Sequence, residues 1–175
     1  MEHYVGLDVS LKTVAVCVVD QSGKIVREGS VPANPEAIAA FTDAKGLGGS
    51  GFASAWLSFA YIASGDFQSA RTACERADDS NKPICFALVY EKLGRHAEAR
   101  QTLAQLQAES GDASAVFYAM IYAQWGDTAH ALDWLETAMR HRDPYLIRVR
   151  KNHNFDPLRN EPRFQAIERE LKFPD

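Results

Sequence analysis

The chain has 175 residues, of which 46% are hydrophobic and 24% charged, so it is long enough for a folded domain with an appendage and too apolar for a disordered protein. The formal net charge is −4, and residues 51–138 carry 6 basic against 11 acidic side chains, which disfavours nucleic acid as a ligand. No apolar run reaches the roughly 18 residues of a membrane span, and no basic-then-apolar leader opens the chain. We therefore expect no membrane contact and no signal peptide.

Three strands are predicted in residues 1–41, at positions 4–9, 13–20 and 25–30, because β-branched residues dominate there. Asn34-Pro35-Glu36 then supplies a helix cap, a first-turn proline and an early acid, which predicts a short helix through Phe41. The result is a small β-β-β-α segment, the order in which ribonuclease-H-like folds begin.

A more specific resemblance lies in the same residues. Tyr-Val-Gly-Leu-Asp-Val-Ser at 4–10, an apolar strand ending at Asp20, and Gly-Lys-Ile-Val-Arg-Glu at 23–28 resemble the N-terminus of IS110-type transposases. The resemblance implies a truncated RuvC-like fold in which Asp8 matches the first of four metal-binding acids. Two-metal cleavage of DNA requires several carboxylates, and the resemblance ends near Phe41, before the other acids. Asp8 is thus only a vestigial candidate, and we expect no catalytic residue, metal or cofactor.

Residues 42–51 are predicted to be a linker or fusion junction. Four glycines and one serine lie between positions 44 and 51, a composition typical of flexible connections. The transposase-like segment would then be fused to an unrelated module.

One pattern recurs three times in residues 52–143. A Tyr lies four residues before a Gly, an Ala follows that Gly by five, and further small or apolar residues follow by nine and twelve. The three sets are Tyr61, Gly65, Ala70, Cys74 and Ala77; Tyr90, Gly94, Ala99, Leu103 and Leu106; and Tyr122, Gly126, Ala131, Leu135 and Ala138. The pattern predicts helix pairs at 52–64 and 67–77, at 83–93 and 96–109, and at 113–125 and 128–142, with Asp112 as the cap of the fifth helix.

The pattern resembles the tetratricopeptide repeat (TPR) family, although its Gly-to-Gly spacings of 29 and 32 residues are shorter than the family's period of about 34. The resemblance implies a mainly α fold. We expect a TPR-like antiparallel helix-pair solenoid of three repeats, with C-terminal capping helices and the small N-terminal β-β-β-α appendage. It also implies a non-catalytic scaffold for protein–protein interaction. The alternative is a residual or non-functional metal-dependent DNA transposase or nuclease fragment fused to a TPR module.

Residues 144–175 are predicted to cap the stack. A short helix at 144–151 would cover its open end with Leu146 and Val149, and an apolar stripe follows, formed by Phe155, Leu158, Phe164, Ile167 and Leu171. The run Phe-Asp-Pro-Leu-Arg-Asn-Glu-Pro-Arg-Phe at 155–164 resembles the closing segment of TPR regions in bacterial signalling proteins with a winged-helix or adenylate-cyclase-like N-terminal domain. No part of such an N-terminal domain is present in this sequence.

In the TPR family the first helix of each pair lines a concave surface. The resemblance implies a peptide-binding groove formed by Phe59, Ile62, Asn81, Ile84, Leu88, Glu91, Lys92, Val116, Met120 and Gln124. Because this set is mostly apolar, we expect it to take a helix or an extended peptide. The alternative is that these residues pack against the N-terminal segment or the C-terminal cap of the same chain.

The three cysteines, Cys17, Cys74 and Cys85, are odd in number and lack metal-ligand spacing. Each lies in an apolar pattern, which favours buried free thiols in a reducing cytoplasm over a disulfide.

A homodimer through residues 1–41 is also expected, because so short a segment buries little surface and exposes strand edges that a second copy would pair. The competing arrangement docks the sheet on the chain's own repeats and leaves a monomer.

Overall fold

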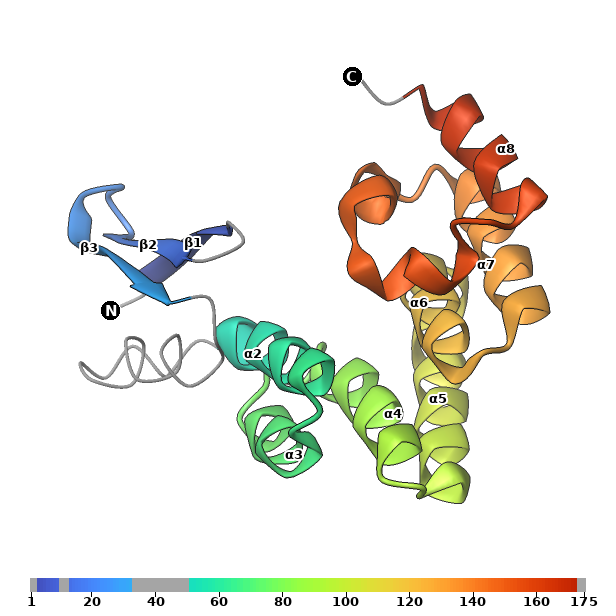
Figure 1. Cartoon of the computed structure of the whole chain (residues 1–175), viewed down its shortest axis with the longest axis horizontal. Coiled ribbons are helices and arrows are strands. Elements are labelled where there is room, and N and C mark those ends of the chain that lie inside the picture. Colours follow the sequence, from blue (N-terminus) through green and yellow to red (C-terminus); the bar gives the residue numbers. More distant parts are fainter. Residues whose placement is uncertain (1–2, 10–12, 33–50, 173–175) are drawn as a thin grey trace. The chain divides into compact units, whose positions relative to one another are not determined.

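The computed structural model describes residues 3–9, 13–32 and 51–172. It confirms the predicted class, a mainly α fold of TPR-like helix pairs with a small N-terminal β segment (Figure 1). The chain forms two compact units, Met1–Leu93 and Gly94–Asp175. The division falls inside the second predicted repeat, between its two helices. None of the helices in these ranges combines the length and apolar character that a membrane crossing requires.

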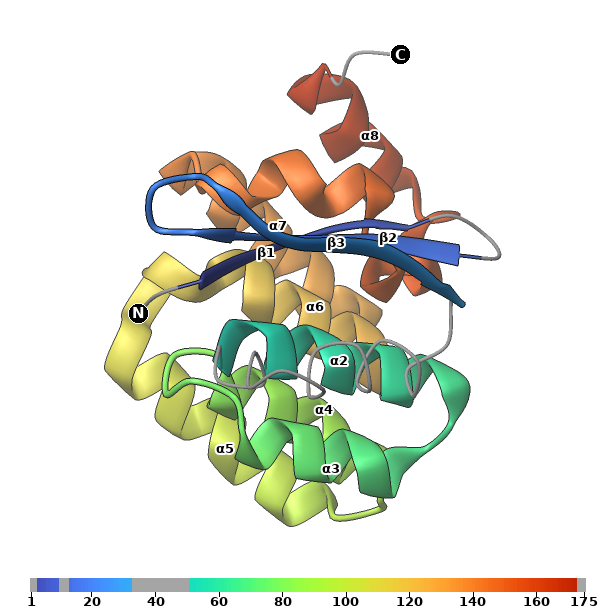
Figure 2. The ribbon, with the colours of Figure 1, turned by 90° about the vertical axis from the view of Figure 1, so that its left-hand side faces the viewer.

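The N-terminal unit begins with a three-stranded antiparallel meander (Figure 2). β1 (His3–Val9) pairs with β2 (Thr13–Asp20), which pairs in turn with β3 (Ile25–Pro32). The run of β-branched residues forms the central strand of this sheet. The three predicted strands are therefore confirmed. The helix predicted through Phe41 and nearly all of the linker predicted at 42–51 lie outside the described residues.

Three helices follow in the same unit: α2 (Gly51–Ser64), α3 (Phe67–Glu75) and α4 (Lys82–Lys92). The chain reverses between α2 and α3 at Gly65, whose φ of 82° is the left-handed conformation that glycine adopts without strain. The amide of Asp66 then donates to the carbonyl of Tyr61 over 3.0 Å, and the Asp66 carboxylate accepts from the amide of Ser69 over 3.0 Å. This side chain caps α3.

The second unit contains the same kind of turn, between α6 and α7. It contains α5 (His96–Ser110), the 3₁₀ helix η1 (Gly111–Ser114), α6 (Ala115–Trp125) and α7 (Thr128–His141). Gly126 has a φ of 79°, the amide of Asp127 donates to the carbonyl of Tyr122 over 2.9 Å, and the Asp127 carboxylate caps α7 by accepting from the amide of His130. The pairs α2–α3 and α6–α7 are thus joined by the same turn, a left-handed glycine followed by an aspartate that caps the second helix.

The recurring apolar positions are buried in both units. All nine are shielded from solvent: Ala70, Cys74 and Ala77; Ala99, Leu103 and Leu106; and Ala131, Leu135 and Ala138. Gly94, the glycine of the second repeat, also has a left-handed φ of 73°. The interpretation of these positions as packing positions is confirmed by their burial, and α2 packs on α3 as α6 packs on α7.

Asp112 does not cap the fifth helix, so this prediction is wrong. α6 begins only at Ala115, and Asp112 lies within η1, where its carboxylate is 3.2 Å from Nε2 of His141. The amide of Ala115, at the start of α6, donates to the backbone carbonyl of Asp112 within this 3₁₀ turn. The turn is held by the hydroxyl of Tyr118, which lies 2.9 Å from the Gly111 carbonyl, and burial raises the pKa of this hydroxyl.

The C-terminal segment folds as η2 (Pro144–Lys151), η3 (His153–Leu158) and α8 (Pro162–Leu171). The helix predicted at 144–151 is present, with 3₁₀ rather than α geometry. The predicted capping residues Leu146, Val149, Phe155, Leu158, Phe164 and Ile167 are buried, and Leu171 is half-buried. η3 packs on α6 and α8 packs on α7. The segment therefore closes this unit with apolar side chains, as expected.

Candidate functional site

The predicted groove residues of the N-terminal unit differ in their exposure. Ile84 and Leu88 on α4 are buried, and Ile62 packs against a core cluster of α3 and α4 residues that includes Val89. Those side chains therefore contribute to packing within the unit. The remaining predicted residues, Phe59, Asn81 and Glu91, are half-buried, and Lys92 is exposed.

Asn81 is held in a turn before α4. Its side-chain amide donates to the Asp78 carboxylate over 2.9 Å, and the Ser80 hydroxyl donates to the same carboxylate over 2.6 Å. Burial raises the pKa of Asp78, but the hydrogen bonds from Ser80 and Asn81 outweigh it and the net pKa is lowered. The polar end of the predicted groove is thus fixed by an ionised carboxylate.

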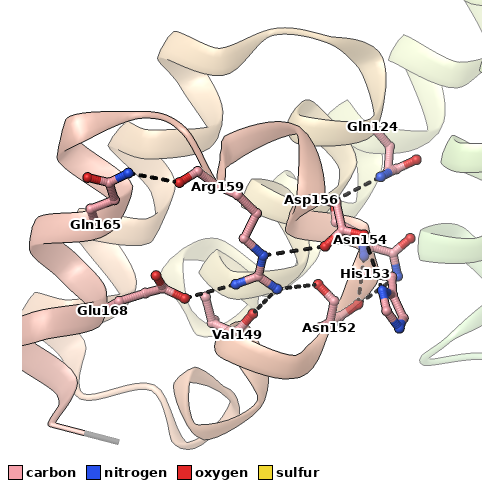
Figure 3. A network of polar contacts seen from close by, with 9 residues as sticks. All are labelled: Gln124, Val149, Asn152, His153, Asn154, Asp156, Arg159, Gln165 and Glu168. Atoms are coloured by element: carbon pink, nitrogen blue, oxygen red, sulfur yellow. Dashed lines mark hydrogen bonds and ion pairs between the residues drawn. The ribbon is translucent and has the colours of Figure 1, made fainter.

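The predicted groove residues of the C-terminal unit lie against the chain's own cap. Val116 and Met120 on α6 are buried, and the Asn152 side-chain amide approaches the Met120 sulfur at 3.9 Å. Gln124 donates through Nε2 to the carbonyl of Asn154 over 2.8 Å (Figure 3). The segment 152–158 therefore covers this face of α6.

The cap is organised by Arg159, whose guanidinium points into the loop of the preceding segment (Figure 3). Nη1 donates to the Glu168 carboxylate over 2.8 Å, and Nε donates to Asp156 over 3.3 Å. Nη2 reaches the carbonyls of Val149 and Asn152 at 3.5 and 3.4 Å. One side chain thus ties η2, η3 and α8 together, and its position in a turn gave no indication of this role in the sequence.

Asp8, the candidate metal ligand implied by the transposase resemblance, lies on β1 opposite Ala15 of β2. Within residues 3–9, 13–32 and 51–172, no group of three or more His, Cys, Asp or Glu side chains is placed to hold a metal ion. The transposase-like and signalling-protein resemblances stay predictions.

The prediction of three free thiols is wrong at two positions. Cys74 on α3 and Cys85 on α4 form a disulfide, with their Cα atoms 5.6 Å apart, whereas Cys17 is free. The turn around Asp78 brings the end of α3 beside the start of α4, and no sequence motif signals that approach. The cysteines therefore no longer support a cytoplasmic location.

The C-terminal unit also has a basic concavity that was not predicted from the sequence. It is lined by Arg150 of η2 and by Gln165, Glu168, Arg169 and Lys172 at α8 and its C-terminal end. The available signal was the charge of residues 139–175, which carry 9 basic and 6 acidic side chains.

Comparison with family models matches residues 87–105 to Tetratricopeptide repeat. The matched stretch spans the end of α4, the turn at Gly94 and most of α5, including the buried Ala99 and Leu103. Neither the curated proteins nor the solved structures contain a match to the chain. TPR repeats are typically non-catalytic. The matched repeat and the recurring buried pattern support a TPR-like protein, and such repeats point in general to a protein-interaction scaffold.

Proposed function

We propose that this chain is a non-catalytic scaffold that binds a helix or an extended peptide of a partner protein. The observation that carries the proposal is the threefold recurrence of a left-handed glycine followed by buried helix-contact positions, one copy of which matches the TPR family. In solenoid repeats each unit contacts only its neighbours, which leaves long helix faces available for ligands.

The binding surface that we propose lies on the N-terminal unit. Phe59, Asn81, Glu91 and Lys92 retain solvent exposure there and combine an aromatic ring with polar and charged groups. This mixture suits a peptide whose apolar side chains are anchored and whose backbone or charges are also contacted. The α6 residues Val116, Met120 and Gln124 would be open to a ligand only if the cap segment moved away.

A peptide library displayed on phage and selected against the full-length chain tests the proposal. We expect enriched peptides to protect α2 and α4 from hydrogen exchange, and we expect the Phe59→Ala and Lys92→Glu substitutions to weaken their binding. Thr72→Ala, at an exposed position on α3, is the matched control. An absence of enrichment, or protection confined to other helices, would contradict the proposed groove.

We also propose that the sheet mediates a homodimer. The strand order leaves β1 and β3 at the edges, and Ile25 at the start of β3 is 54% exposed. Unpaired strand edges with apolar side chains favour pairing with another chain. Light scattering should report a dimer for the full-length chain and a shift toward monomer for Ile25→Lys. A monomeric parent chain would refute this arrangement.

A further inference from the structure

The basic concavity of the C-terminal unit has a volume of about 440 Å³ and lies apart from every predicted groove residue in the sequence. Three of its lining side chains are cationic: Arg150, Arg169 and Lys172, all of them exposed. The only acid among the lining residues is Glu168. The concavity therefore gathers cations from two separate elements, η2 and the end of α8.

The single acid is already neutralised by a partner. Glu168 accepts a hydrogen bond from Nη1 of Arg159 over 2.8 Å, and Gln165 donates through Nε2 to the backbone carbonyl of Arg159 over 3.1 Å. Glu168 and Gln165, the two lining residues that are not cationic, are thus both held by Arg159 of the cap. Because the pairing with Arg159 offsets the charge of Glu168, the wall presents a net positive surface to a ligand.

An exposed apolar side chain lies on the same 3₁₀ helix as Arg150. Ile147 is 75% exposed and precedes Arg150 by three residues. Since η2 is a 3₁₀ helix with three residues per turn, positions 147 and 150 lie on the same face. A large exposed apolar side chain on the face that carries one of these cations suits a ligand with both acidic and apolar groups.

We propose that this concavity binds an acidic peptide segment, with its carboxylates on Arg150, Arg169 and Lys172 and an apolar side chain on Ile147. Guanidinium groups match carboxylates in a two-pronged geometry, and the lysine adds a point charge. The inference rests on the proposed scaffold function and adds a second site with its own ligand chemistry.

Nucleic acid fits this surface less well than a peptide does. A nucleic acid would place a track of phosphates across a wider area, and the chain as a whole carries a net charge of −4. It would also leave Ile147 without an apolar partner. The peptide class satisfies both the cations and the exposed isoleucine.

Fluorescence anisotropy on the full-length chain can test the site, with a short labelled peptide in which Glu and Asp residues flank one Leu. We expect the paired substitution Arg169→Glu and Lys172→Glu to weaken binding by at least about tenfold. Arg100→Glu, an exposed substitution on α5, is the matched charge control and should change affinity by less than about twofold. Ile147→Ala should weaken binding without changing its salt dependence.

Three results would overturn the proposal. They are equal binding of a peptide with Gln and Asn in place of Glu and Asp, an equal loss of affinity with Arg100→Glu, and tighter binding of oligothymidylate than of the acidic peptide. The peptides selected by phage display, which are expected to bind the N-terminal unit, distinguish a failure of this proposal from a failure of the proposed scaffold function. If they still bind the Arg169→Glu, Lys172→Glu variant while the acidic peptide binds no form of the chain, only the concavity proposal fails.

Discussion

The guanidinium of Arg159 lies over the ring of Phe164, with its central carbon 5.3 Å from the ring centroid. Phe164 is buried, so the cation and the ring form one packed contact at the base of α8. The same guanidinium also contacts two carboxylates and two carbonyls. A cation held over an aromatic face contributes more stabilising free energy in a partly desolvated site than it does in water.

Replacing this arginine should destabilise the C-terminal unit strongly. Arg159→Met keeps an apolar stem, leaves Glu168 without this donor and removes a second hydrogen bond from the carbonyls of Val149 and Asn152, which also accept from backbone amides. We expect a loss of about 2–3 kcal/mol in the free energy of unfolding. Urea denaturation measures it. Arg163→Met is the control, because Arg163 binds Asp133 and Glu136 at the exposed surface of α7. A similar loss in both variants would refute the central role of Arg159.

The reversal glycines can be tested without any change in packing. A Cβ at Gly126 would meet no heavy atom within 4 Å, so Gly126→Ala introduces only backbone strain at a φ of 79°. We expect it to cost about 1–2 kcal/mol, measured by thermal unfolding. Gly126→Asn should cost less, since asparagine tolerates the left-handed region. An alanine variant as stable as the parent would contradict this turn geometry.

The small residue of the second repeat should resist enlargement. Ala99 on α5 is fully buried, and Ala99→Leu should overpack its surroundings at a cost of about 1–3 kcal/mol. Ala104→Leu is the matched control, because Ala104 is exposed on the same helix. Chemical denaturation of the two variants gives the difference. Equal stabilities would refute the repeat assignment at its centre.

Reduction of the disulfide should weaken the N-terminal unit. Cys74 and Cys85 are separated by 11 positions, and closing so short a loop constrains the unfolded chain by about 2–3 kcal/mol. Urea denaturation with and without a reductant should show this difference. It should persist in Cys17→Ser and vanish when Cys74 and Cys85 are both replaced by alanine. A parent chain that is insensitive to reductant would disprove the bond.

The cap of α3 should make stability depend on acid pH. The Ser69 side chain and backbone amide lower the pKa of Asp66 below its usual range. Its contribution is therefore fully present above the ordinary carboxyl pKa of about 3.9 and is lost as the pH falls through the lower pKa of the folded chain. Asp66→Asn keeps a cap but not the charge, so its melting temperature should fall less over that pH range. A parallel fall in both chains would contradict this assignment.

The features predicted from the sequence are those that depend on neighbours along the chain. The positions of Gly65, Gly94 and Gly126 follow from local turn chemistry, and Ala70 and its counterparts follow from helical spacing. The partners of Arg159 could not be predicted, because Val149 and Glu168 reach it only after η2, η3 and α8 have folded. The Cys74–Cys85 bond could not be predicted for the same reason, since it depends on the approach of two helices. Likewise, the position of Gln124 on α6 did not reveal that Asn154 would bind it.

The contact between Gln124 and Asn154 makes the cap a tethered competitor for the α6 face. A ligand from solution would have to displace a segment whose effective concentration is set by its covalent attachment. The apparent dissociation constant of that ligand would rise as the fraction of chains with an uncovered α6 face falls. Affinity at this face would then be governed by the stability of the cap. A substitution such as Arg159→Met would weaken the fold and, by the same change, strengthen binding at a surface that it does not touch.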